Sequence, residues 1–128
     1  MLAAKSILLS DFGGVGTPHV RKVFEQLGIA EEMKRKTVYA KVAGAAGIAQ
    51  AMKETDADVS LTQLQEFAPV AAMEIVGPLP GDLGLATLFS AAIMGSTKDV
   101  QAARALVNFL RTPEAAAIIK DKGLDSAF

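Results

Sequence analysis

The first half of the chain alternates short apolar runs with amphipathic stretches. Residues 6–10 form an apolar run that ends at a turn signal, which predicts a buried strand. Further strands are expected at residues 37–42, 58–62 and 74–76, where apolar and β-branched residues gather. Because predicted helices separate these strands, the pattern favours an α/β fold, with a parallel or mixed sheet flanked by helices.

The helices of this half are predicted from their end signals and their apolar stripes. Thr17 and Pro18 place a capping hydroxyl before the residue best tolerated at a helix start, and Gly28 supplies a stop. A second short helix from Ala30 has acidic residues early and basic residues late, as the helix dipole favours. A third follows a flexible turn at residues 44–47. The expected apolar positions are Val20, Val23, Phe24 and Leu27 in the first helix, and Ile48, Ala51 and Met52 in the third.

The pattern changes after residues 77–81, Gly-Pro-Leu-Pro-Gly, which suit neither a helix nor a central strand. Residues 85–94 are a long apolar run without strict alternation, which predicts a strand buried on both faces. Two helices are expected next, at residues 96–111 and from Thr112, the second with Ile118 and Ile119 buried and a stop at Gly123.

The length of 128 residues favours one domain, residues 1–128. We expect it to consist of an α/β unit at residues 5–80, followed by a return strand and two C-terminal helices at residues 85–128. The apolar runs are far shorter than the roughly 20 residues of a membrane span, and the first residues lack the pattern of a signal peptide. The expectation is therefore a soluble chain without an export signal of its own.

Charge and cysteine content exclude several classes of function. Thirteen basic and fourteen acidic side chains give a net charge of −1, which argues against a nucleic-acid surface. The absence of cysteine excludes disulfides and thiolate chemistry. His19 is the only histidine, so neither a zinc site nor a catalytic triad can be assembled from the motifs, and we expect His19 to be solvated. No cofactor and no metal are predicted.

The first candidate binding site is the turn that follows the first strand. Asp11 is followed by Gly14, Gly16 and Thr17, so a strand, a glycine-rich turn and a helix start come in succession. Such an arrangement presents backbone N–H groups and a positive dipole end to an anion. Neither the Walker phosphate loop nor the dinucleotide fingerprint matches the glycine spacing. An ordinary strand-to-helix turn is the alternative.

Two further candidates lie where other strands of the sheet are expected to end. Gly47 and Ile48 belong to the second glycine-bearing turn, and Gln63 follows the third strand. Ligands of open α/β sheets bind at this carboxyl edge, and an amide such as that of Gln63 can donate to a ligand oxygen. The alternatives are a plain loop and a residue that merely begins the next helix. A phosphoacceptor receiver domain built on Asp11 is disfavoured, because no acidic neighbour in its turn completes a magnesium site.

Several segments together resemble the periplasmic molybdate-binding protein family, the type II solute-binding proteins of ABC transporters. The resemblance rests on segments that follow the family's order and cover nearly the whole chain. They are AAKSILLSD (3–11), VFEQLGIAEEMKRKT (23–37), ADVSLTQLQEF (57–67), VGPLPGDL (76–83) and ARALVNFLRTPEAAAIIKDKGL (103–124).

The resemblance implies a two-lobed α/β clamp that binds a small oxyanion such as molybdate with hydroxyl and backbone N–H groups, without metal. This chain would supply the second lobe and the C-terminal segment. The turn from Asp11 to Thr17 and the backbone of Gly47 and Ile48 match ligand-facing parts of the family. Gln63 stands where the molybdate binders have a tyrosine, and the first turn is shorter than usual. Both departures weaken the case for molybdate itself.

We therefore predict a non-enzymatic solute-binding component of an ABC-type transporter, periplasmic by resemblance, with its permease as partner. The resemblance also implies that a first lobe, absent here, covers the apolar return segment. An uncovered apolar face is expected to self-associate, so a homodimer is predicted. The alternative is a truncated, self-associating structural or interaction domain that has lost ligand binding.

Overall fold

The computed structural model of the chain describes residues 1–67, 71 and 73–126. The chain divides into two compact units, Met1–Leu85 and Ala86–Phe128. Whether these units belong to one domain stays a prediction, and each is described below by itself.

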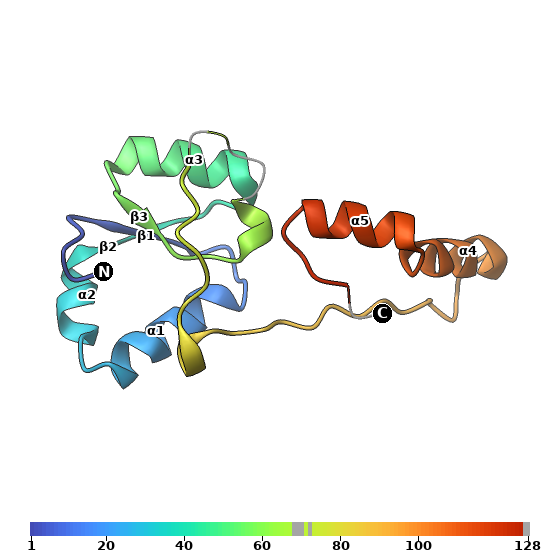
Figure 1. The fold of residues 1–128 in the computed structure, drawn as a ribbon, viewed down its shortest axis with the longest axis horizontal. Coiled ribbons are helices and arrows are strands. Elements are labelled where there is room, and N and C mark those ends of the chain that lie inside the picture. Colours follow the sequence, from blue (N-terminus) through green and yellow to red (C-terminus); the bar gives the residue numbers. More distant parts are fainter. Residues whose placement is uncertain (68–70, 72, 127–128) are drawn as a thin grey trace. The chain divides into compact units, whose positions relative to one another are not determined.

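Unit 1 is built on a three-stranded parallel sheet (Figure 1). Its strands are β1 (Ile7–Ser10), β2 (Thr37–Ala40) and β3 (Val59–Ser60), in the order β2-β1-β3. β1 is central, with Ile7 opposite both Thr37 and Val59. The predicted α/β fold with a parallel sheet is thus confirmed, although β2 and β3 are shorter than expected.

Helices cover both faces of this sheet: α1 (Gly16–Gln26) and α2 (Ala30–Lys36) on one, and α3 (Gly44–Thr55) on the other (Figure 1). Successive side chains of a strand point to opposite faces, and β1 is apolar on both. The core therefore forms two clusters. Ile7 and Leu9 pack with Val20, Phe24 and Met33, whereas Leu8 packs with Ile48 and Ala51.

The end of α1 follows the sequence signal closely. Gly28 has a φ of 68°, its N–H donates to the carbonyl of Glu25, and the N–H of Ile29 donates to the carbonyl of Phe24. These two bonds are the pair that closes a helix at a left-handed glycine. Ile29 also packs against the core beside Phe24, and the chain then turns directly into α2.

Two expectations about helix starts in unit 1 are wrong. Thr17 does not cap α1: Val15 occupies the cap position without a side-chain bond, and the Thr17 hydroxyl donates to the carbonyl of Ser10 instead. Residues 44–47 are not a turn, because α3 already begins at Gly44. The left-handed Gly44, with a φ of 72°, forms the bend at the helix start.

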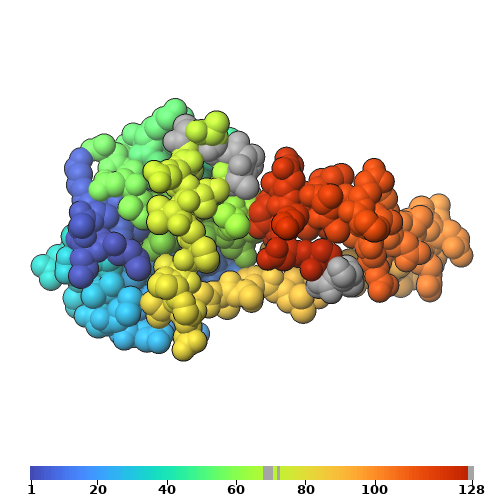
Figure 2. Space-filling view, in the orientation of Figure 1, coloured from blue at the N-terminus to red at the C-terminus, as the bar shows by residue number. Residues whose placement is uncertain are grey.

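The expectations of a solvated His19 and of a fourth strand at residues 74–76 are also wrong. His19 is half-buried, and its Nε2 lies 2.7 Å from the carbonyl oxygen of Leu83, at the end of a short 3₁₀ turn, η2 (Gly81–Leu83). Residues 74–76 are not a strand. Instead residues 73–85, yellow in Figure 2, run over the outside of unit 1.

Unit 2 contains α4 (Val100–Leu110) and α5 (Pro113–Asp121). The Asp99 carboxylate caps α4 through the N–H of Ala102, and the Thr112 hydroxyl caps α5, as predicted, through the N–H of Ala115. Gly123, with a φ of 82°, ends α5 as expected.

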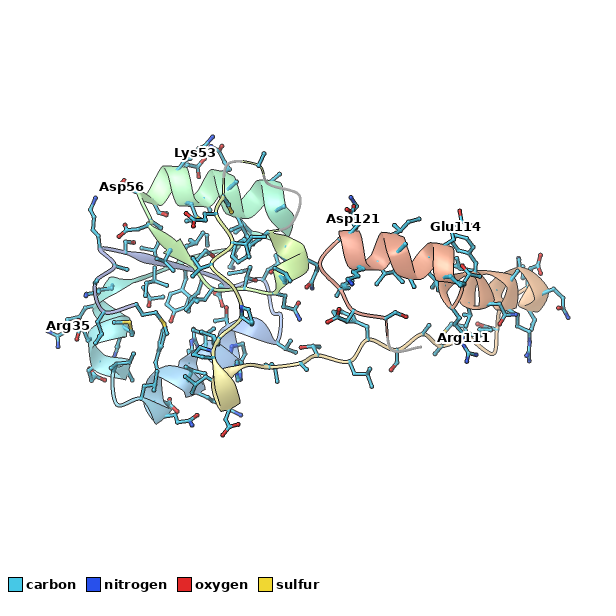
Figure 3. All side chains as sticks on the ribbon, in the orientation of Figure 1. Arg35, Lys53, Asp56, Arg111, Glu114 and Asp121 are labelled. Carbon is cyan, nitrogen blue, oxygen red and sulfur yellow. The ribbon has the colours of Figure 1, made fainter. Side chains whose placement is uncertain are left out.

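The prediction of a buried return strand is wrong, because residues 85–94 are exposed and form no strand pairing with any described residue. Ile118, predicted to be buried, is 54% exposed, and Ile119 is only partly covered. Charged side chains of both units, among them Arg35, Lys53 and Glu114, point away from the backbone into solvent (Figure 3).

Candidate functional site

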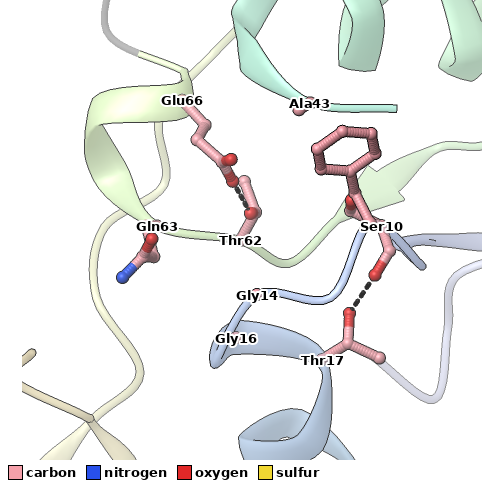
Figure 4. Close-up of a pocket in the computed structure, with 9 residues that line it drawn as sticks. Ser10, Gly14, Gly16, Thr17, Ala43, Thr62, Gln63 and Glu66 are labelled. Atoms are coloured by element: carbon pink, nitrogen blue, oxygen red, sulfur yellow. Dashed lines mark hydrogen bonds between the residues drawn. The ribbon is translucent and has the colours of Figure 1, made fainter. Parts of the chain in front are cut away.

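A small pocket of about 70 Å³ lies beyond the carboxyl ends of the three strands of unit 1 (Figure 4). That volume holds a handful of waters, at roughly 10–15 Å³ for each, so it suits a small solute. The pocket is lined by Ser10, Phe12, Gly14, Gly16, Thr17, Ala43, Thr62, Gln63 and Glu66.

The parallel topology explains why these residues meet. Ser10 and the glycine turn follow β1, Ala43 follows β2, and Thr62 with its neighbours follows β3. The carboxyl ends of parallel strands lie at one edge of a sheet, where open α/β folds bind their ligands. A short 3₁₀ turn, η1 (Leu64–Glu66), brings Glu66 back toward Thr62.

Three hydroxyl groups of the lining donate to the protein itself. Thr17 Oγ1 donates to the Ser10 carbonyl at 2.5 Å, and Ser10 Oγ donates to the Val42 carbonyl at 2.5 Å. Thr62 Oγ1 donates to the Glu66 carboxylate, as the dashed line in Figure 4 marks. These bonds tie the strand ends to the loops that follow them, so the hydroxyls serve the architecture of the pocket.

The glycine turn supplies the free hydrogen-bond donors. Within the described residues, the N–H groups of Gly14, Gly16 and Thr17 donate to no acceptor of the protein. Gly16 and Thr17 also belong to the first turn of α1, where backbone N–H groups have no partner inside the helix and the dipole is positive. Gln63 adds a side-chain amide whose oxygen accepts from Gln65 Nε2 at 3.0 Å. The pocket can therefore donate to a ligand chiefly from backbone.

Of the residues that line the pocket, Glu66 is the one that carries a charge. It is half-buried and accepts a hydrogen bond from the Thr62 hydroxyl. Within the described part of the chain, no three or more His, Cys, Asp or Glu side chains gather closely enough to hold a metal ion. No described helix has the length and apolar character needed to cross a membrane.

Four of the predicted site residues meet in this pocket: Gly14, Gly16, Thr17 and Gln63. The other three lie outside the lining. The Asp11 side chain is exposed, while its N–H donates to the Ala40 carbonyl and extends the pairing of β1 with β2. Gly47 and Ile48 lie inside α3, and Ile48 packs into the core under Leu8.

Ser10, the last residue of the strand predicted at residues 6–10, directly precedes the first candidate turn and lines the pocket. The sequence analysis did not single out Glu66 as a pocket residue. Glu66 stands four residues after Thr62, the spacing that brings two side chains together across a helical turn. That spacing was available in the sequence, but it becomes informative only once the loop is known to face the pocket.

Comparison with known proteins places these features in context. The family model described as "Bacterial extracellular solute-binding protein" matches residues 4–125. A protein named aconitate isomerase, from a Pseudomonas species, is 29% identical over 121 residues, which are 94% of this chain and 45% of that protein. The chain thus spans less than half the length of that relative. No solved structure matches the chain significantly.

The bond between Thr17 and the Ser10 carbonyl should be measurable in the stability of the protein. Replacing Thr17 by Val keeps the β-branched shape but removes the donor, and we expect the free energy of unfolding to fall by about 1 kcal/mol. Thr17→Ser retains the hydroxyl and should lose less than half as much. Urea unfolding followed by circular dichroism measures both changes, and equal losses in the two variants would contradict this role.

Proposed function

We propose that this chain, which belongs to the bacterial extracellular solute-binding protein family, binds a small anionic solute in the pocket beyond β1. The observation that carries the proposal is a set of backbone N–H groups, at the pocket-lining residues Gly14, Gly16 and Thr17, that have no acceptor among the described residues. A glycine turn that leads into a helix start favours negative charge through its aligned dipoles.

The chemistry of the lining supports binding by dipoles. It includes neither lysine nor arginine, so an anion would be held by N–H groups and the Gln63 amide. The pocket volume of about 70 Å³ suits one tetrahedral oxyanion or one carboxylate group of a larger solute. The resemblance to the molybdate-binding family suggests an oxyanion, whereas the name of the Pseudomonas relative, aconitate isomerase, suggests a carboxylate.

The place of action follows from the family in the same way. The proteins of this family are described as extracellular, which favours the periplasm as the compartment in which this protein meets its solute. We further propose that the solute is handed to an ABC-type permease, as the resemblance to transport proteins implies.

Thermal unfolding with a panel of anions tests the binding proposal. Molybdate, sulfate, phosphate and aconitate are each added at millimolar concentration, with chloride at equal ionic strength as control. An anion at about a hundred times its dissociation constant should stabilise the protein by roughly 2.7 kcal/mol, a shift of several degrees for a chain of this size. If every anion leaves the midpoint at the chloride value, the proposal fails.

Isomerisation is a second candidate, favoured by the relative's name and by Glu66 as a proton-accepting group in the pocket. We expect binding without turnover, because a proton acceptor alone does not polarise the substrate, and the lining holds no cationic side chain or metal ligand cluster to do so. Incubation with cis- or trans-aconitate, followed by proton NMR, distinguishes the two. Conversion above the buffer rate that disappears in Glu66→Gln would establish catalysis.

Self-association is proposed for the apolar surface of unit 2. Residues 91–97 and α4 form an apolar groove of about 250 Å³, lined only by uncharged side chains such as Met94, Leu106 and Leu110. The large apolar side chains that unit 2 exposes are Leu88, Phe89, Ile93, Met94, Val100, Leu106, Phe109, Leu110 and Ile118.

The area of this surface fits a second copy of the chain. These side chains are between 38% and 79% exposed. A large apolar side chain has roughly 100 Å² of apolar area, so together they present on the order of 500 Å². A standard interface buries about 800 Å² on each partner and is a little over half apolar. A two-fold dimer that buried these side chains in each copy would therefore have the usual apolar content.

Light scattering at tens of micromolar tests the dimer, and the expected mass is twice the 13.3 kDa of the chain. Leu106→Asp introduces charge into the groove and should shift the mass toward that of one chain. Lys98→Asp, which changes charge outside the groove lining, is the control. A mass of 13.3 kDa for the unaltered chain would contradict self-association.

A further inference from the structure

The hydroxyl groups of the pocket have no proton left for a ligand. Ser10, Thr17 and Thr62 each carry one hydroxyl proton, and each donates it to a protein acceptor. Toward a bound solute, these three oxygens can therefore only accept hydrogen bonds. A solute that consists of acceptors alone would make no hydrogen bond to these oxygens.

Glu66 strengthens this demand for a donor. When ionised, its carboxylate accepts hydrogen bonds and donates none. One oxygen, Oε2, accepts from Thr62, and the structure gives Oε1 no donor among the described residues. An anion without a proton would meet like charge at this point, whereas an anion with an O–H group could donate to the free oxygen.

The backbone donors of the pocket come from a different segment than Glu66. Gly14, Gly16 and Thr17 offer backbone N–H groups from the turn after β1, while Glu66 and Thr62 belong to the loop after β3 (Figure 4). Backbone N–H donors and the Glu66 carboxylate therefore reach the pocket from different segments. A complementary solute has negative oxygen at one end and a hydrogen-bond donor at the other.

We propose that Glu66 makes this site selective for anions that carry their own hydroxyl or acid proton. The negatively charged oxygen would lie against the glycine turn, and the O–H group would donate to Glu66. This inference rests on the proposed binding function and names its ligand class. It assigns a disadvantage to fully deprotonated tetrahedral anions, sulfate and molybdate among them.

Inorganic phosphate and sulfate form a matched pair for the test, because both are tetrahedral but only phosphate retains an O–H group at neutral pH. Binding to the full 128-residue chain is measured by NMR, from the amide shifts of Gly14, Gly16 and Thr17. We expect phosphate to bind at least about tenfold more tightly than sulfate, as one hydrogen bond to a charged group implies. Malate and succinate, which differ by one hydroxyl, should show the same order without any mutation.

Glu66→Gln removes the charge and adds a donor, so sulfate should bind more tightly and the phosphate preference should fall below about threefold. Glu54→Gln, on the exposed face of α3, removes the same charge far from the lining and should leave the preference unchanged. Equal binding of phosphate and sulfate, or a preference that survives in Glu66→Gln, overturns the selectivity and leaves the binding function intact. If none of the four anions binds, both are overturned.

Discussion

The structure of unit 1 depends on the complete burial of β1 from both sides. Ile7, Leu8 and Leu9 have no exposed surface, and they face two different helical layers. A strand covered in this way must be central and must pair on both edges, since a buried N–H or C=O without a partner is costly. β2 and β3 supply that pairing, and α1, α2 and α3 supply the cover.

The candidate site is a consequence of this burial. Because β1 is fixed in the middle, its carboxyl end at Ser10 lies between the ends of the two neighbouring strands. The N–H groups of Gly14, Gly16 and Thr17 then donate to no described residue, and the Thr17 hydroxyl holds the start of α1 against the strand end. The same bonds that position the loops also occupy the hydroxyl protons of Ser10, Thr17 and Thr62.

Unit 2 illustrates the opposite situation. Its helices have good end signals, and the caps at Asp99 and Thr112 form, but no described side chain of α4 is buried. Residues 85–94 are apolar enough for a buried strand, yet the part of unit 2 that the structure describes contains no strand that could pair with them. Local capping can therefore define a helix, whereas a strand needs a neighbour for its backbone hydrogen bonds.

The sequence by itself determined the elements whose signals are local. The apolar run at β1, the glycine stop at Gly28 and the cap at Thr112 each act within a few residues. The parallel α/β class follows from the alternation of predicted strands and helices in the first half of the chain. The glycine turn and Gln63 were likewise recognisable as candidates, because strand ends of a parallel sheet meet at one edge.

Only the tertiary structure decided what these residues do. It gave the Thr17 hydroxyl to Ser10 instead of to the helix, drew Ile48 into the core, and placed Glu66 in the pocket. It also left residues 85–94 without strand pairing to any residue that the structure describes. The physical reason is that burial and hydrogen-bond partners depend on segments far apart in the chain, which no local pattern specifies.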